Sequence, residues 1–363
     1  MKIKLKEIGK IITGKTPPKN EKDAYGNTMN FLTPSDLKGQ RFSDITARQL
    51  SEKGVRGLKN NIVSGPSISV SCIGSNMGKT IFNKEAIITN QQLNSITFIR
   101  NDVNPLYLYY LLISKRELLH FIGSNQGSTM PILNKNDFGN LEFEIPSFEE
   151  QNYISGKLNL LDREIELNNQ INDNLISLAT ALFNKYFPNI NSGNEMIGNF
   201  ISNYDRLRKP LSKKERLSIP GKYRYIGATS VNDYINKYNF DGIYLLLGED
   251  GTVEDDNGYP ILQYISGKFW PNNHAHVLQG KNVSTEWLYL FFKQRKITSI
   301  VTGAVQKKIS QKNLNSLSIS IPDKDKLARF DTIINPIFKN IRIIESENHS
   351  LEKIKVELLS KLF

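Results

Sequence analysis

Apolar residues recur at alternating steps of three and four in two long segments of the chain, 158–186 and 334–362. This spacing is typical of the a/d seam of a coiled coil. It predicts two helices of about 36 residues, each ~54 Å long. The alternative is that each helix is amphipathic and packs only on its own domain. The seam positions are Leu158, Leu161, Ile165, Asn168, Asn172, Leu175, Ala179, Leu182 and Tyr186 in the first segment, and Ile334, Ile337, Ile341, Ile344, Asn348, Leu351, Lys355, Leu358 and Leu362 in the second.

Both segments belong to a longer internal repeat. When the chain is shifted by 176 residues, 127–187 aligns with 303–363 without a gap, and eleven of the 61 aligned positions are identical. Composition alone would give roughly four identities. Upstream, FLTPSDL (31–37) is similar to YIGATSV (225–231), and Asn90-Gln91-Gln92 falls near Asn272-Asn273-His274. The chain is therefore interpreted as a duplicated unit.

Each copy is predicted to be a mixed, strand-rich domain followed by a helix, which makes the fold class α+β with a pseudo-two-fold internal repeat. The two helices are expected to run antiparallel about the pseudo-two-fold axis, with Asn172 and Asn348 near its midpoint. Buried asparagine at a seam costs stability but fixes register. Lys355 is expected to cover the seam with its aliphatic stem. The predicted boundaries are 1–147 for the first domain, 148–190 for the first helix, 191–322 for the second domain and 323–363 for the second helix.

A second apolar stripe runs beside the seam, although a two-stranded coiled coil should leave that face polar. In the second copy the stripe is thinner, because Glu347 interrupts it. A helix from a partner protein would cover such a stripe, whereas the alternative is that the chain's own domains cover it. The residues of the stripe are Leu160, Leu167, Ile171, Leu178 and Phe183 in the first copy, and Ile343 and Ile354 in the second.

The segment 67–82, SISVSCIGSNMGKTIF, is at first sight a phosphate-binding loop. That loop requires four residues between its two glycines and a helix after them. Here only Ser75, Asn76 and Met77 separate Gly74 from Gly78, and the residues that follow alternate as a strand, a turn and a strand. The segment is therefore predicted to be a hairpin with a glycine-rich tip, whose Lys79 points toward a polyanion.

Composition narrows the partner and the compartment. The net charge of +11 and the pI of 9.4 favour nucleic acid as a partner. A single cysteine and four histidines indicate neither a disulfide framework nor a zinc site. The chain has no run of 18 apolar residues and no secretory signal, so we expect a cytoplasmic protein that does not contact a membrane.

Side chains able to contact DNA cluster at places predicted to be loops. The segment 205–216 is rich in Arg and Lys, and it is either a phosphate-binding segment or a solvated loop. Asn and Gln can pair with adenine and Lys can contact guanine, although most hydrogen bonds of such complexes go to the backbone. The candidate DNA-binding residues are Lys15, Thr16, Lys19, Asn76, Lys79, Asn90, Gln91, Asn125, Gln126, Arg208, Lys209, Lys213, Lys214, Asn272, Asn273, His274, Gln306, Lys307 and Lys308.

This arrangement resembles the specificity subunit of type I restriction-modification systems over nearly the whole chain. The resemblance is carried by the openings KLKEIGKIITGKTP and MIGNFI, by FLTPSDL, by the hairpin after residue 67, by Asn272-Asn273-His274, and by the helix copies that end in Phe187 and Phe363. It implies that each strand-rich domain is a target-recognition domain that reads one half of a split double-stranded DNA target. It also implies that the helices hold these domains apart and dock two methyltransferase subunits, which restriction subunits join in the full complex.

The resemblance implies a non-catalytic subunit that binds no cofactor itself, with S-adenosylmethionine, ATP and Mg²⁺ on the partner subunits. The sequence agrees, because the nearest string to a base-pocket [DNS]-P-P-[YF] motif is Thr16-Pro17-Pro18-Lys19, which lacks both the acceptor and the aromatic residue. The acidic segment 249–258 lacks the spacing of an EF-hand and is predicted to be a hairpin with an Asn-Gly turn. The rival hypothesis is a coiled-coil scaffold that recruits partner proteins without reading DNA.

Overall fold

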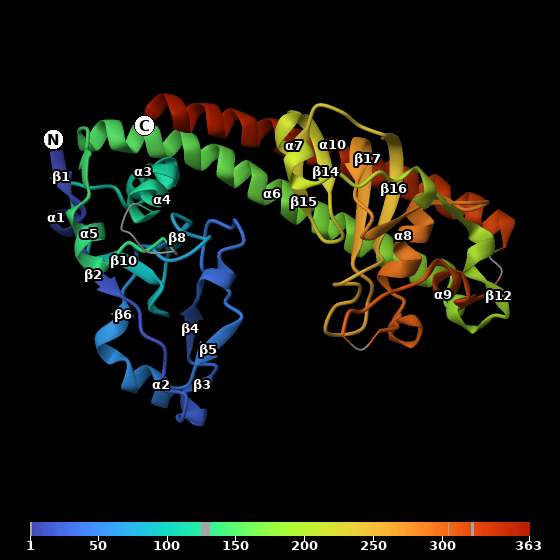
Figure 1. The fold of residues 1–363 in the computed structure, drawn as a ribbon, viewed down its shortest axis with the longest axis horizontal. Coiled ribbons are helices and arrows are strands. Elements are labelled where there is room, and N and C mark those ends of the chain that lie inside the picture. The colour runs from blue at the N-terminus through green and yellow to red at the C-terminus, as the bar shows by residue number, and fades with distance from the viewer. Residues whose placement is uncertain (1, 125–130, 304, 321–322) are drawn as a thin grey trace. The chain divides into compact units, whose positions relative to one another are not determined.

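The computed structural model describes residues 2–124, 131–303, 305–320 and 323–363. The chain forms two compact units, of which unit 1 comprises 1–165 with 349–363 and unit 2 comprises 166–348. Two long helices, α6 (Phe148–Tyr186) and α10 (Lys324–Leu362), contribute residues to both units (Figure 1). Each has 39 residues, and a shift of 176 relates both ends of α6 to both ends of α10. The α+β fold with a duplicated helix is therefore confirmed.

The described residues of unit 1 form three sheets, with strand orders β1-β11, β2-β10-β7-β8 and β3-β5-β4-β9-β6. Its strands are β1 (Lys2–Lys4), β2 (Lys10–Thr13), β3 (Tyr25–Gly26), β4 (Met29–Leu32), β5 (Arg48–Leu50), β6 (Ile62–Val63), β7 (Ser67–Ser71), β8 (Thr80–Asn83), β9 (Ile87–Thr89), β10 (Leu93–Thr97) and β11 (Glu142–Glu144). Its shorter helices are α1 (Leu5–Ile8), α2 (Glu52–Gly57), α3 (Pro105–Ser114), α4 (Arg116–Ser124) and α5 (Lys135–Asn140).

Unit 2 contains a two-stranded sheet, β12-β19, and a six-stranded sheet with the order β13-β18-β16-β17-β14-β15. Its strands are β12 (Glu195–Met196), β13 (Ile201–Asn203), β14 (Pro220–Ile226), β15 (Val231–Ile235), β16 (Phe240–Gly248), β17 (Leu262–Pro271), β18 (Ala275–Gly280) and β19 (Ser318–Ile319). Its shorter helices are α7 (Lys213–Ser218), α8 (Thr285–Lys293) and α9 (Gln311–Asn315).

The two units share a topology that sequence identity alone barely reveals. The antiparallel order β2-β10-β7-β8 of unit 1 corresponds to β13-β18-β16-β17 of unit 2, and a mostly buried helix, α3 or α8, follows the second strand of each set. In both units the first strand pairs with the strand that precedes the long helix, as β1 with β11 and β12 with β19. The duplication inferred from the sequence thus extends to the sheets.

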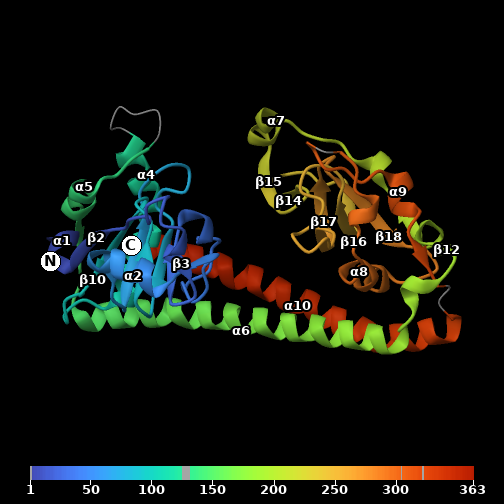
Figure 2. The ribbon, with the colours of Figure 1, turned by 90° about the horizontal axis from the view of Figure 1, so that it is seen from below.

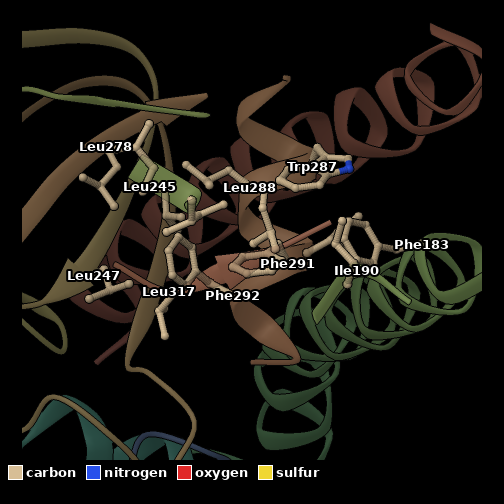
Figure 3. Close-up of a cluster of buried hydrophobic side chains, with 14 of the residues drawn as sticks. Phe183, Ile190, Leu245, Leu247, Leu278, Trp287, Leu288, Phe291, Phe292 and Leu317 are labelled. Carbon is tan, nitrogen blue, oxygen red and sulfur yellow. The ribbon is translucent and has the colours of Figure 1, made fainter. Parts of the chain in front are cut away.

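Aromatic side chains from α6 and α8 meet aliphatic side chains in the core of unit 2 (Figure 3). The ring of Trp287 on α8 stacks on that of Phe291, with centroids 5.7 Å apart. Phe183 of α6 packs on Trp287 at 5.5 Å and on Phe330 of α10 at 5.8 Å. Because all four rings are buried almost completely, they attach the helix pair to the sheet of unit 2.

The seam residues predicted from the sequence are all buried or half-buried. In unit 1 the beginning of α6 packs on the end of α10, where Leu158 and Leu358 belong to one core. In unit 2 the end of α6 packs on the beginning of α10, so the helices run antiparallel in each unit. Lys355 does more than cover the seam, because its Nζ lies 2.5 Å from a carboxylate oxygen of the buried Asp162.

Asparagine side chains interrupt the apolar seam within unit 2. The side-chain oxygen of Asn348 accepts a hydrogen bond from Asn168, and its amide nitrogen donates one to Asn169, both at 2.9 Å. Within the described part of the chain, the side-chain oxygen of Asn172 is buried without a hydrogen-bond partner. The register contact that Asn348 makes therefore involves Asn168 and Asn169.

Both hairpins expected from the sequence are present. Strands β7 and β8 pair antiparallel, and the glycines at their tip, Gly74 and Gly78, have φ values of +77° and +79°. In the acidic segment, the N–H of Gly258 donates to the carbonyl of Asp255 at 3.0 Å, and Gly258 has a φ of +85°. Such positive φ values favour glycine over residues with a Cβ. Among the described residues, no helix has the length and apolar character needed to cross a membrane.

Candidate nucleic-acid interface

Three loops of unit 1 meet at one edge of its four-stranded sheet. Because β2 and β7 end where β10 begins, the antiparallel pairing places the loops 14–19, 72–79 and 90–92 side by side. Backbone hydrogen bonds join them, from Lys15 to the carbonyl of Thr89 and from Cys72 to that of Gln92, each at 2.8 Å. Candidate residues from three separate stretches of sequence thereby form one loop cluster.

Gly14 is required for this close approach. A Cβ at Gly14 would lie 2.1 Å from the carbonyl oxygen of Asn90 and 2.2 Å from that of Thr89. Both oxygens belong to the backbone, so a side chain there would push the loops 14–19 and 90–92 apart.

The side chains of the unit 1 loops differ in how free they are to bind DNA. Lys15, Lys19 and Gln91 are exposed, and Gln91 accepts a hydrogen bond of 2.6 Å from the hydroxyl of Thr16. Asn90 is buried, and its side-chain oxygen accepts from the backbone N–H of Gln92 at 3.1 Å. Asn90 thus forms the turn and is not exposed for base contact. Asn125 and Gln126 lie outside the described residues.

The sequence predicted that Lys79 extends from the hairpin tip toward a polyanion. In the structure it does not extend freely. Its side chain is half-buried, and its ammonium donates a hydrogen bond of 3.1 Å to the carbonyl of Leu37. Asn76 at the same tip is also half-buried. The lysine therefore holds the hairpin against the loop around Leu37.

Unit 2 builds an equivalent cluster at the matching edge of its sheet. Strands β13 and β16 end where β18 begins, so the loops 204–209, 249–251 and 272–274 come together. Asn272 repeats the role of Asn90, because its side-chain oxygen accepts from the N–H of His274 at 2.8 Å. Segment 305–309 joins the cluster through a hydrogen bond from Ile309 to the carbonyl of Glu249 at 2.9 Å.

A buried ionic network connects these loops. The ring of His276 is only 1% exposed, and its Nδ1 lies 2.6 Å from an oxygen of Asp205. Its Nε2 lies 2.9 Å from the carbonyl oxygen of Ile309. A carbonyl and a carboxylate are both acceptors, so both ring nitrogens donate and the ring is an imidazolium. Arg208 donates to Glu249 at 2.7 Å and to the carbonyl of Ala275 at 2.6 Å.

Both titratable partners of this pair are stabilised in their charged forms. Burial disfavours the charged ring, but the hydrogen bond and negative charge of Asp205 raise the pKa of His276 above its ordinary value. Burial likewise favours a neutral Asp205, but the hydrogen bond and positive charge of His276 lower the pKa of Asp205. The pair therefore stabilises folded unit 2 at neutral pH.

Asp205, Glu249 and His276 offer ligand atoms within 4.8 Å of one another. This group does not fit a metal cation, because Arg208 already supplies a positive charge to Glu249, and both nitrogens of His276 carry protons. We interpret it as a structural ion network. No local sequence pattern indicates it, since its members come from three different strand ends.

The candidate residues of unit 2 fall into two groups. Arg208 is mostly buried and its guanidinium is engaged within the network, so it is not the exposed phosphate contact expected from the sequence. Lys307 and Lys308 are half-exposed and pair with Glu254 at 2.8 Å and Asp250 at 3.3 Å. The candidates with exposed side chains and no ion pair in the described structure are Lys209, Lys213, Lys214, Asn273 and Gln306, and His274 lies 4.0 Å from Asp250.

The apolar stripe of the long helices is largely exposed. Leu160 is 67% exposed, and Leu167, Ile171, Leu178, Ile343 and Ile354 are exposed by about half. Phe183 is the exception and corrects the prediction, because it lies in the core of unit 2 against Trp287. Tyr153 extends the stripe one heptad upstream of Leu160 and is also exposed; the sequence reasoning missed it because it precedes the seam.

The chain is similar to known proteins along its length. The family described as type I restriction modification DNA specificity domain matches residues 1–176 and 201–356. The type I restriction enzyme MjaIX specificity subunit of Methanocaldococcus jannaschii is 24% identical over 400 residues, which cover 99% of this chain and 91% of the relative. A putative type I restriction enzyme specificity subunit of Haemophilus influenzae is 33% identical over 127 residues, which cover 35% of this chain and 31% of the relative.

A solved structure has a similar fold along the whole chain. It is the S subunit of a type I restriction-modification system from M. genitalium, with a TM-score of 0.55 and 16% identity. The similarity covers 100% of this chain and 96% of that chain.

Proposed function

Because the chain belongs to the type I restriction-modification DNA specificity family, we propose that it reads a bipartite DNA target with one half-site per unit. One observation carries this proposal: the same three-loop cluster recurs at the same edge of the same four-stranded arrangement in both units. Two similar clusters with different side chains suit two different half-sites. A scaffold that binds only proteins would have no need for two such clusters of exposed amide and basic side chains.

Within each cluster, the exposed residues are the proposed contacts. Lys15 and Lys19 in unit 1, and Lys209 with α7 in unit 2, would contact phosphates, since they are free cations on loops or at a helix start. Gln91 and Asn273 follow the two turn-forming asparagines directly and are exposed. Their position in equivalent loops and their bidentate amides make them the proposed base readers.

The exposed stripe on α6 and α10 supports a second part of the proposal. Apolar side chains exposed on one face of a helix are typical of a protein interface. We assign this stripe, without Phe183 and with Tyr153, to the methyltransferase subunits. Restriction subunits would join the complex through them.

Catalysis and its cofactors are assigned to these partners. In the loop cluster of unit 2, the buried side chains of Arg208 and His276 are engaged in hydrogen bonds and ion pairs that position loops. In this proposal, S-adenosylmethionine, ATP and Mg²⁺ are held by the partner subunits, and this chain supplies target choice.

Exchange of single domains tests the proposal. We expect the complex with its methyltransferase partner to modify a split, asymmetric target, mapped by methylation sequencing of a genome. Replacing 1–147 or 191–322 with the corresponding segment of a relative should change one half-site and leave the other intact. Both halves changing together, or no sequence preference in the parent complex, would contradict the two-reader proposal.

A further inference from the structure

Two tyrosines and two lysines that none of the loop clusters includes form a surface patch on unit 2. The rings of Tyr223 on β14 and Tyr238 before β16 lie edge to face, with centroids 4.9 Å apart. The ammonium of Lys268 on β17 lies 4.6 Å from the Tyr238 ring centroid, and that of Lys222 lies 5.4 Å from the Tyr223 centroid. We call these four residues the tyrosine–lysine patch. Tyr238 and both lysines are exposed.

The positive charge of the patch is not neutralised by ion pairs. Among the described residues, no ion pair includes Lys222 or Lys268, although Asp241 faces Lys268 across β16 and β17. The cation–π contacts hold the ammonium groups near the rings without changing their charge. The patch therefore presents two positioned cations beside two aromatic rings.

The patch is continuous with the loop cluster of unit 2. The side chain of Asn239, next to Tyr238, donates to the carbonyl of Leu207 at 3.0 Å. Trp270, two residues after Lys268, donates from its ring nitrogen to the carbonyl of Lys209 at 2.6 Å. These bonds attach the basic segment 205–209 directly to the strands that carry the patch. Helix α7 lies beside the edge strand β15 of the six-stranded sheet (Figure 2).

We propose that the tyrosine–lysine patch binds the phosphate backbone of the DNA beside the half-site that unit 2 reads. This inference rests on the proposed function of the loop clusters. A lysine ammonium is a point charge suited to phosphate, and a position held over a ring reduces the rotamer freedom lost on binding. Three of its residues lie on β14 and β17 and Tyr238 shortly precedes β16, and such a position on the sheet suits contact with the DNA backbone better than entry into a groove.

Salt-dependent binding to DNA tests the patch in the assembled complex. The probes are a duplex with the mapped target and a duplex of the same composition with that target scrambled. The test variant is Lys222→Gln with Lys268→Gln, and the control is Lys281→Gln with Lys312→Gln, two exposed lysines of unit 2 outside the patch. Unchanged melting temperatures verify folding, and arginine at both patch positions should restore binding.

Each phosphate contact contributes a slope of about −0.9 in the plot of log affinity against log salt. Because the patch variant lacks two such contacts, its slope should be less steep than that of the parent by about 1.8 on both duplexes. Between 1 M and 0.1 M salt, the gain in affinity should therefore be smaller by about eightfold for each lysine removed. An unchanged slope would overturn the proposal, and so would a loss confined to the target duplex or an altered half-site. The proposed function fails if the parent complex shows no preference for the target duplex over the scrambled duplex. In that case the difference in salt slope between parent and patch variant still decides whether the patch binds phosphates.

Discussion

The buried imidazolium of His276 makes the stability of unit 2 depend on pH, and His276→Asn tests this directly. Unit 1 provides the template for the substitution. At the equivalent position it has Asn94, whose amide donates to the carbonyl of Leu133 just as His276 donates to that of Ile309. In unit 1 the second partner is the neutral hydroxyl of Thr13, which donates at 2.6 Å. The variant therefore keeps the carbonyl contact and removes the positive charge together with the hydrogen bond to Asp205.

The stability lost in His276→Asn depends on the hydrogen bonds and charges that remain around Asp205. Removing one partner of a buried ion pair costs roughly 3–5 kcal/mol. Here Asp205 keeps hydrogen bonds from the N–H of Val277 at 2.8 Å and the amide of Asn203 at 2.9 Å, and Arg208 lies 3.6 Å away. We therefore expect a loss of about 2–3 kcal/mol, at or just below the lower end of that range. For a unit of this size this corresponds to a melting temperature lower by about 4–12 °C.

The sign of the pH dependence is fixed by the raised pKa of His276. Its contribution is complete below the unfolded value of about 6.5 and is lost as the pH rises through the higher folded pKa. The parent protein should thus lose stability above that pH, whereas His276→Asn should lack this loss. The pKa of Asp205 is lowered, so its contribution is present above about pH 4 and is lost as the pH falls through the folded value.

The assay is calorimetry, which measures the melting temperatures of the parent and of His276→Asn between about pH 5.5 and pH 9. This range begins about one unit below the reference pKa of histidine and ends well above it. The matched control is the exposed His274→Gln, which should change the melting temperature little at any of these pH values. Asp205→Asn added to His276→Asn should recover part of the loss, because it removes the unpaired carboxylate. A difference between parent and His276→Asn that stays constant across this range would refute the charged-ring assignment.

Three further predictions concern the helices. Asn348→Ala should lower the free energy of unfolding by about 1–3 kcal/mol in chemical denaturation, because it removes the hydrogen-bond partner of the buried Asn168 amide and that of Asn169, whereas the exposed Asn174→Ala should change it by less than about 0.5 kcal/mol. Leu160→Ser should weaken binding of the methyltransferase subunit at least about tenfold in a titration, since a buried leucine contributes about 1.5–3 kcal/mol, and Asp173→Ser, an exposed position on the opposite face of the same helix, should leave it unchanged. Inserting one heptad after Asn172 and another after Asn348 lengthens each helix by ~10 Å. Methylation maps should then show an unread spacer that is longer by about three base pairs, with both half-sites unchanged. An unchanged spacer would mean that the helices do not set its length.

Sequence periodicity predicted the helices because burial repeats with the helical period. Every seam position from Leu158 to Leu362 is at least half-buried, and the 176-residue shift reproduces both helix ends. The same periodicity misplaced Phe183, which is adjacent to the seam residue Leu182. At that turn the core of unit 2 covers more of the helix than the seam alone, and Trp287, a hundred residues away in the chain, fills the space beside it.

The loop clusters were only partly predictable. Asn90 and Asn272 were identified as corresponding residues, but their side chains close turns, which composition does not distinguish from base contacts. Arg208 was selected for its charge, and its burial depends on Glu249 and Ala275, which strand pairing brings to it. Strands as short as β3 or β6 carry too few residues for an alternating pattern, so the five-stranded sheet of unit 1 was not foreseen.

The ion pair between Asp162 and Lys355 also bears on how a duplicated chain avoids pairing with itself. Under the 176-residue shift, Lys355 corresponds to Ala179 and Asp162 to Phe338, so the pair has no counterpart in the other copy of the repeat. Two first copies brought together through α6 would bury Asp162 opposite alanine, and two second copies would bury Lys355 opposite phenylalanine. An uncompensated buried charge costs several kcal/mol, and a symmetric dimer would contain two of them. The mismatch thus makes each long helix discriminate against a copy of itself in favour of its diverged twin.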